Sequence, residues 1–206
     1  MPAEMARDEL TNLEYALLGL IGMAPMSGYD VHKVFAGTPL AHFSSSPGAI
    51  YPALRRLARR GLLSARLDTT TETRPRRIHA LTPAGEQALE AWLRQPVTRE
   101  DLVRGAGAPI LRFAFAESRL TPEEVIAYLD SYRQSLEAYL EELRAHARRM
   151  RPEAGVHARL ALDHGIRGYQ SDLEWVRATT AAISGAGRGP RRSRGRAGIS
   201  GRDRRR

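Results

Sequence analysis

Cysteine is absent from the 206-residue sequence, which excludes disulfide bonds, thiolate zinc sites and cysteine nucleophiles. The sequence also lacks any run of the roughly 18 to 20 uninterrupted apolar residues that a membrane-spanning helix needs. Its first residues, MPAEMARDEL, include acids where a secretory signal peptide would carry lysine and arginine. We therefore expect a cytoplasmic protein with no membrane association.

Lysine is almost absent as well: the chain contains one lysine, Lys33, and 31 arginines. The formal net charge of +9 is unevenly distributed: residues 185–206 hold nine arginines and one acid, which leaves only +1 for the rest of the chain. Residues 50–80 hold eight arginines against two acids, a local excess of +6. This local excess, rather than the total charge, indicates a nucleic-acid-binding surface.

The first half of the chain reads as short elements. One helix is expected from about Thr11 to Met23, and a second is expected to begin at the N-cap Ser27 and to end before Pro39. The first helix should bury a single face, and the second should bury its larger apolar and aromatic side chains. The residues expected to be buried are Leu10, Leu13, Leu17, Leu20 or Ile21, Tyr29, Val31, Val34 and Phe35.

A third helix follows three serines and places Ile50, Leu54 and Leu57 on its inner face, with Gly61 just past its end. Pro52 removes one backbone hydrogen bond, so this helix is expected to start late or to be distorted. Residues 62–68 and 76–82 read as two short strands around a polar tip, the pattern of a wing. Thr82 and Pro83 then form the N-cap and first residue of a fourth helix.

Two long helices are predicted in the second half. Residues 120–125 combine an N-cap threonine, a proline and a capping-box glutamate. Apolar residues then recur at alternating spacings of four and three, before and after Pro152, which is typical of coiled-coil seams. Two such seams predict an antiparallel hairpin that buries its remaining apolar surface in a homodimer. The predicted dimerisation residues are Leu129, Leu136, Leu143, Leu173 and Val176.

The predicted fold is therefore mainly α with a small β-wing. It comprises an N-terminal winged helix-turn-helix domain (1–95), a connector (96–119), a C-terminal antiparallel, coiled-coil-like dimerisation domain (120–184) and an arginine-rich tail (185–206). The tail lacks apolar periodicity and is expected to be disordered. It either adds salt-dependent, non-specific affinity for DNA or is a neutral extension.

The sequence resembles the PadR family of bacterial winged-helix regulators. The resemblance rests on LEYALLGL at residues 13–20, SGYD at 27–30, SPGAIYPAL at 46–54 and LTPAG at 81–85, in order over about the first 95 residues. Members often carry a tyrosine near the start of the second wing strand, where this chain has His79. The helical second half resembles the family's dimerisation domain by position and pattern only.

This resemblance implies a homodimeric repressor that binds double-stranded DNA at an inverted-repeat operator. The third helix would enter the major groove, and the wing would approach the backbone or the minor groove. The DNA-binding residues expected on this basis are Ser46, Tyr51, Arg55, Arg56, Arg59, Arg74, Arg76 and Arg77. The alternative is a non-specific nucleic-acid binder or protein-interaction adaptor that uses the hairpin and the basic tail, with the arginines of the third helix forming only a solvated face.

The remaining aromatic and histidine residues are interpreted mainly as structural. Tyr15 and Tyr29 are expected in the core, and Trp92 is expected to pack between the two halves. Trp175 is expected to pack beside the seam, with stacking on a small aromatic or phenolic effector as the alternative. The scattered histidines lack the spacing of a metal site, and no catalytic constellation is present, so we expect no enzyme, metal or cofactor.

Overall fold

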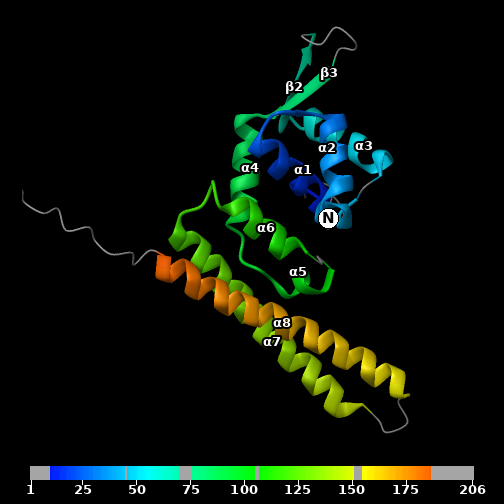
Figure 1. The fold of residues 1–206 in the computed structure, drawn as a ribbon, viewed down its shortest axis with the longest axis vertical. Coiled ribbons are helices and arrows are strands. Elements are labelled where there is room, and N and C mark those ends of the chain that lie inside the picture. Colours follow the sequence, from blue (N-terminus) through cyan, green and yellow to red (C-terminus); the bar gives the residue numbers. More distant parts are fainter. Residues whose placement is uncertain (1–9, 45, 70–75, 105–106, 151–154, 187–206) are drawn as a thin grey trace, which may run out of the picture.

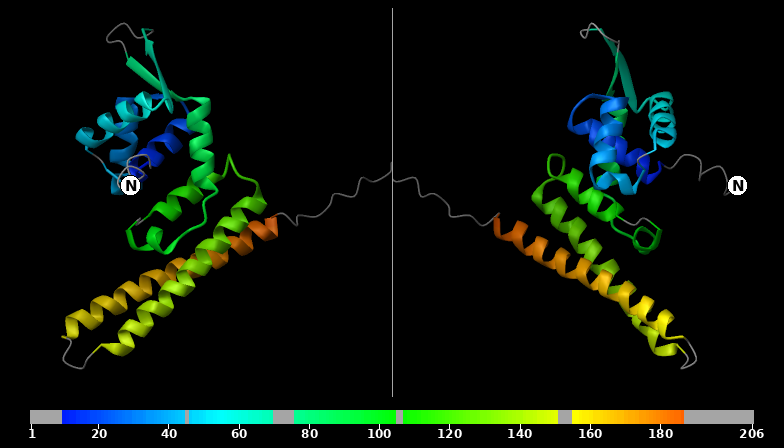
Figure 2. Two further views of the ribbon diagram at one scale, coloured as in Figure 1. Left: turned by 180° about the vertical axis from the view of Figure 1, so that it is seen from behind. Right: turned by 45° about the vertical axis from the view of Figure 1, so that its right-hand side comes forward.

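The computed structural model describes residues 10–44, 46–69, 76–104, 107–150 and 155–186 (Figure 1). It is mainly helical with a small antiparallel sheet, as predicted. The elements are α1 (Asn12–Met23), β1 (Met26–Ser27), α2 (Gly28–Gly37), the 3-10 helix η2 (Pro39–His42), α3 (Pro47–Arg59), β2 (Leu63–Asp68), β3 (Arg76–Leu81), α4 (Pro83–Leu93), α5 (Arg99–Arg104), α6 (Ala108–Ala116), α7 (Pro122–Arg149) and α8 (Val156–Ala186). Strands β2 and β3 project from one end of the molecule, and the α7–α8 hairpin projects from the other (Figure 2).

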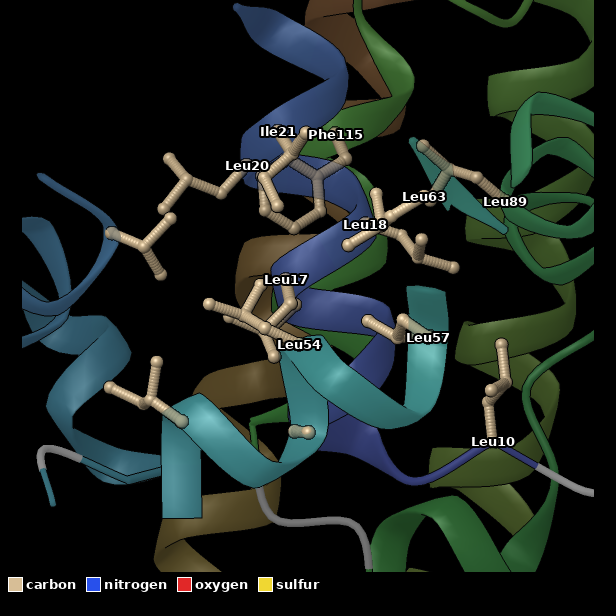
Figure 3. Close-up of a cluster of buried hydrophobic side chains, with 14 of the residues drawn as sticks. Leu10, Leu17, Leu18, Leu20, Ile21, Leu54, Leu57, Leu63, Leu89 and Phe115 are labelled. Carbon is tan, nitrogen blue, oxygen red and sulfur yellow. The ribbon is translucent and has the colours of Figure 1, made fainter. Parts of the chain in front are cut away.

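Helix α1 lies at the centre of the larger hydrophobic core. The sequence pattern predicted one buried face, but all six residues from Ala16 to Ile21 are buried. Elements α2, α3, α4, α6 and β3 surround this helix, so its apolar side chains point into the core in several directions. Figure 3 shows Leu17 beside Leu54 of α3, and Ile21 beside Phe115 of α6.

Four of the helices in the described residues begin with a complete capping box. In each, the cap hydroxyl accepts the N–H of the third helical residue, and the carboxylate of that residue accepts the N–H of the cap. The pairs are Thr11–Glu14 in α1, Ser27–Asp30 in α2, Thr98–Asp101 in α5 and Thr121–Glu124 in α7. The predicted N-cap at Ser27 and the predicted capping box at Thr121 are thus confirmed.

The wing consists of β2 and β3, which pair antiparallel from Leu63↔Leu81 to Asp68↔Arg76. Both strands were predicted within a residue of their observed ends. Strand β1 was not predicted, and it pairs with β3 through Met26↔His79, so the sheet order is β1-β3-β2. A strand of two residues is too short to show alternation in the sequence.

Hydrogen bonds of the segment Leu81–Gly85 connect the start of α4 to the turn at the end of α3. Thr82 is the N-cap of α4: its hydroxyl accepts the Gly85 N–H at 3.0 Å and donates to the Gly61 carbonyl at 2.6 Å. The Thr82 N–H donates to the Leu62 carbonyl at 3.1 Å. A Cβ at position 85 would overlap that same carbonyl, so glycine is the residue that permits the approach.

The segment 96–119, expected as a connector, contains α5 and α6. Helix α6 packs against α1 so closely that a Cβ on Gly19 would overlap the ring of Phe115. One helical turn further on, Arg119 donates to the Gly22 carbonyl at 3.0 Å and pairs with Glu86 of α4. The two halves of the chain are therefore joined by direct helix contacts.

Trp92 lies at the same junction, as predicted. Its ring stacks on Tyr15 of α1 with centroids 4.4 Å apart and an interplanar angle of 4°. The guanidinium of Arg112 lies 5.4 Å from the Trp92 ring, pairs with Asp101 at 2.6 Å and donates to the Gln95 carbonyl at 3.1 Å. Arg112 is only 3% exposed, so these partners compensate its charge inside the protein.

Helices α7 and α8 form the predicted antiparallel hairpin, and α8 ends two residues beyond the predicted boundary at 184. Tyrosine hydroxyls attach this hairpin to the rest of the chain: Tyr128 donates to the Pro109 carbonyl at 2.8 Å, and Tyr169 donates to the Leu102 carbonyl at 3.1 Å. The predicted tail lies outside the described residues from position 187 onward.

His79 lies in the central strand of the sheet with 8% of its surface exposed. Burial and the nearby charge of Arg77 lower the pKa of His79 below its ordinary value of 6.5. The imidazole is therefore neutral in the folded protein near pH 7.

We expect Gly85→Ala to lower the free energy of unfolding by about 1–3 kcal/mol, because the added methyl group meets the Leu62 carbonyl. Urea denaturation measures this effect. Gly37→Ala is the control, since a Cβ there meets no atom within 4 Å and alanine favours helix. Equal stability of the Gly85 variant and the wild type would contradict the close approach.

Acidification is expected to destabilise the protein through His79. The unfolded imidazole binds a proton below about pH 6.5, whereas the folded one resists protonation, so this contribution to stability is lost as the pH falls below that value. The loss is at most about 1.4 kcal/mol per pH unit. Urea denaturation at pH 7.5 and pH 5.5 should show a smaller pH dependence for His79→Phe than for the wild type.

Candidate nucleic-acid interface

Helix α3 presents an apolar face and a basic face. Ile50, Leu54 and Leu57 are at most 2% exposed and pack in the core, as predicted. The opposite face is exposed and carries Tyr51, Arg55, Arg56, Arg59 and Arg60. Burial of the apolar face therefore holds α3 in place and keeps its basic residues on the surface.

Both ends of α3 are defined by hydrogen bonds. Ser46 is the exposed N-cap, and its hydroxyl accepts the Gly48 N–H at 3.2 Å. At the other end, Gly61 has a φ of 71° and donates to the Ala58 carbonyl at 3.1 Å, while the Leu62 N–H donates to the Leu57 carbonyl at 3.0 Å. This is a Schellman motif, and it confirms the predicted role of Gly61.

Pro52 does not delay or end the helix. The expectation of a late start is wrong, because α3 begins at Pro47 and continues through Pro52. Proline has no N–H, so the carbonyl of the exposed Gly48 lacks its usual helical donor. The buried apolar face keeps this turn helical despite the lost hydrogen bond.

A surface hollow of about 540 Å³ lies where α2, α3 and β3 meet. The residues that line it are Ser27, Gly28, Tyr29, Tyr51, Leu54, Arg55, Arg76, Arg77 and His79. A Cβ on Gly28 would lie 2.8 Å from the Tyr51 ring, so this glycine lets the ring lie against the start of α2. The hollow brings Tyr51 and Arg55 of α3 together with Arg76 and Arg77 of the wing.

Tyr29 belongs to this surface, contrary to the expectation of a core tyrosine. It is 62% exposed, because Val31 and Phe35 form the inner face of α2 and Tyr29 lies on the other side. Arg66 on β2 is also exposed and was omitted from the predicted site residues. Arg66 is, however, one of the eight arginines that give residues 50–80 their excess of positive charge.

Arg56 differs from the other arginines of α3, because its Nε donates to Oε1 of Glu14 in α1 at 2.9 Å. Burial alone would raise the pKa of Glu14, but hydrogen bonds from the Thr11 backbone and from Arg56 hold the pKa below its ordinary value. Nothing in the spacing of the sequence indicates this pair. Arg74, also a predicted site residue, lies outside the described residues.

The predicted dimerisation residues pack largely within one chain. Leu129, Leu136, Leu173 and Val176 belong to the apolar cluster between α7 and α8, and Leu143 is half-buried. The apolar seam of α7 and the apolar seam of α8 pack against each other within the hairpin. The large apolar side chains that remain exposed on α8, within the described residues, are Val156 and Leu160, at 56% and 60%.

Trp175 is half-buried and packs edge-on against Phe113, with ring centroids 5.1 Å apart. Phe113 also lines an apolar hollow of about 460 Å³ together with Leu120, Val125 and Ile183. The structure therefore gives Trp175 a packing role.

The described residues offer neither a metal site nor a membrane-spanning helix. These residues contain no group of three or more His, Cys, Asp or Glu side chains that could hold a metal ion. Among their helices, none is long and apolar enough to cross a membrane.

Two family models match the chain. Residues 17–91 match the Transcriptional regulator PadR-like family, and residues 111–184 match the Virulence activator alpha C-term family. The "Negative transcriptional regulator PadR" of Bacillus subtilis is 32% identical over 87 residues. That match covers 41% of this chain and 48% of the relative, so it spans about half of the relative's length.

Solved structures are similar to this chain over most of its length. Bacillus subtilis PadR in complex with operator DNA is 25% identical, with 85% of this chain and 99% of that chain covered and a TM-score of 0.40. The PadR-like regulator BC1756 from Bacillus cereus is 22% identical, with 85% and 98% covered and a TM-score of 0.38. The PadR-like family model matches the residues that build α3 and the wing, so this part of the chain is similar to the transcriptional regulator PadR-like family.

Proposed function

We propose that this protein is a homodimeric, sequence-specific DNA-binding regulator that represses transcription from a palindromic operator. The observation that carries the proposal is the basic face of α3, which meets the wing arginines at one hollow. A repressing role is supported by the name of the Bacillus subtilis relative, a negative regulator. A dimer with two-fold symmetry would require an operator with the same symmetry.

The chemistry of this surface suits duplex DNA. An exposed α-helix fits the major groove, where an arginine can donate two hydrogen bonds to guanine O6 and N7. Arg55 and Arg59 are exposed on α3 and are proposed to read bases. Arg76 and Arg77 on the wing are proposed to bind phosphates, with Tyr29, Tyr51 and Ser46 close to the DNA backbone.

We also propose that a small aromatic effector controls the regulator. The apolar hollow beside Phe113 lies where α6 meets the start of α7 and the end of α8. An aromatic molecule bound there would contact α6, which packs directly on α1.

We expect Arg55→Ala and Arg59→Ala each to weaken operator binding by about 1–3 kcal/mol for each half-site. The operator affinity of each variant should fall toward the affinity that the wild type has for unrelated DNA. The operator is first selected from random duplexes, and affinities are then measured by fluorescence anisotropy. Arg167→Ala, an exposed arginine remote on α8, is the control and should change neither affinity.

Deletion of residues 187–206 should weaken binding to operator and unrelated DNA alike, and should make the salt dependence less steep. Footprinting on the selected DNA should show a protected palindrome. Uniform protection of all sequences would instead support the non-specific binder or adaptor. Loss of operator preference on deletion of the tail alone would contradict the assignment to α3.

The dimer is proposed to use the exposed apolar side chains of the hairpin. Leu160→Glu should shift the mass in sedimentation equilibrium from dimer toward monomer, with the helical content retained. Leu136→Ala should instead lower the stability of the hairpin by about 2–5 kcal/mol, because Leu136 is fully buried within one chain. A monomeric wild type at micromolar concentration would refute the dimer.

A further inference from the structure

The carboxylate of Glu14 joins the first turn of α1 to the basic helix α3. Glu14 is 3% exposed, and its two oxygens have separate partners. Oε2 accepts the Thr11 N–H at 2.9 Å and the Thr11 hydroxyl at 3.0 Å, and Oε1 accepts Nε of Arg56 at 2.9 Å. The side chain of Arg56 is 45% exposed, so the pair stands at the edge of the core.

The α1 end of this pair is immobilised by its surroundings. The capping box fixes the Glu14 carboxylate against Thr11, and the next residue, Tyr15, is stacked on Trp92. A charge-assisted hydrogen bond to such a fixed group is directional, unlike the apolar contacts of Ile50, Leu54 and Leu57 beneath α3. It therefore fixes the rotation of α3 about its own axis as well as its distance from α1.

The rotation of α3 about its axis determines where its arginine side chains meet the DNA bases in the proposed complex. Arg55 and Arg59 flank Arg56 on the exposed surface, and a small turn of the helix would move both guanidinium groups relative to the base edges. Positioning to within a fraction of an ångström matters for paired hydrogen bonds. Arg56, held by Glu14, has part of its charge compensated within the protein.

We propose that Glu14 is a positioning residue for α3, acting through Arg56, and that Arg56 serves this ion pair rather than contacting DNA. The inference rests on the proposed function and assigns a different task to one of the predicted DNA-binding residues. Two groups thus determine sequence preference without touching the DNA.

A double-mutant cycle on the full chain tests the proposal. Glu14→Gln keeps a capping-box side chain, since glutamine also serves at this position, and removes the charge that holds Arg56. Glu14→Gln, Arg56→Gln and the double variant are measured against the selected operator and an unrelated duplex of equal length. Circular dichroism and urea denaturation give the folded fraction, so that affinities are compared only where each variant is folded.

The expected result is a loss of operator affinity of about tenfold in each single variant and no larger loss in the double variant. Affinity for unrelated DNA should change less than twofold, a selectivity that general destabilisation would not produce. The salt slope should be unchanged by Arg56→Gln, whereas the control Arg77→Gln should reduce it by about 1.8, because each protomer of the dimer loses one phosphate contact.

The opposite pattern overturns the proposal. If Arg56 contacts DNA, Glu14→Gln leaves operator affinity unchanged or raises it, while Arg56→Gln weakens both duplexes and reduces the salt slope. Additive losses in the double variant also contradict the positioning role. Failure of the proposed function is distinguishable, because the wild type itself would then show no preferred sequence.

Discussion

The structure depends on the burial of α1 on every side. Six consecutive residues of this helix are buried, which is feasible only when other elements surround it completely. Helix α3 covers one side with its apolar face, α4 and β3 cover others, and α6 covers the side that contains Gly19. The basic surface of α3 and the start of the C-terminal half are therefore positioned by the same helix.

Close backbone approaches determine how tightly these elements assemble. Gly19 and Gly22 of α1 leave room for Phe115 of α6 and for Arg119 in the turn after α6, and Gly85 leaves room for the turn that ends α3. Buried polar groups complete the contacts where apolar packing ends, as Arg112 does with Asp101. The contact between the two halves of the chain therefore includes close helix packing, the Arg112–Asp101 ion pair and the stacked rings of Tyr15 and Trp92.

Local signals in the sequence predicted the helix ends, the wing strands and the hairpin, because caps, turns and periodicity act over a few residues. Contacts between distant residues left no such signal. The Arg56–Glu14 pair is separated by 42 positions, and the exposure of Tyr29 depends on which face of α2 the core selects. The seams were recognised, but the sequence could not show that each helix buries the other's seam within one chain.

The placement of the two tryptophans gives the protein a pair of intrinsic optical reporters. Trp92 lies between the Tyr15 ring and the Arg112 guanidinium, so its emission depends on the charge and stacking at the junction of the two halves. Trp175 lies on α8 against Phe113 of α6, at the contact between α6 and the hairpin. Replacing either tryptophan by phenylalanine leaves the other as the single tryptophan, so selectively excited tryptophan emission records movement at the contact with Tyr15 and Arg112 or at the contact between α6 and α8, without an added label.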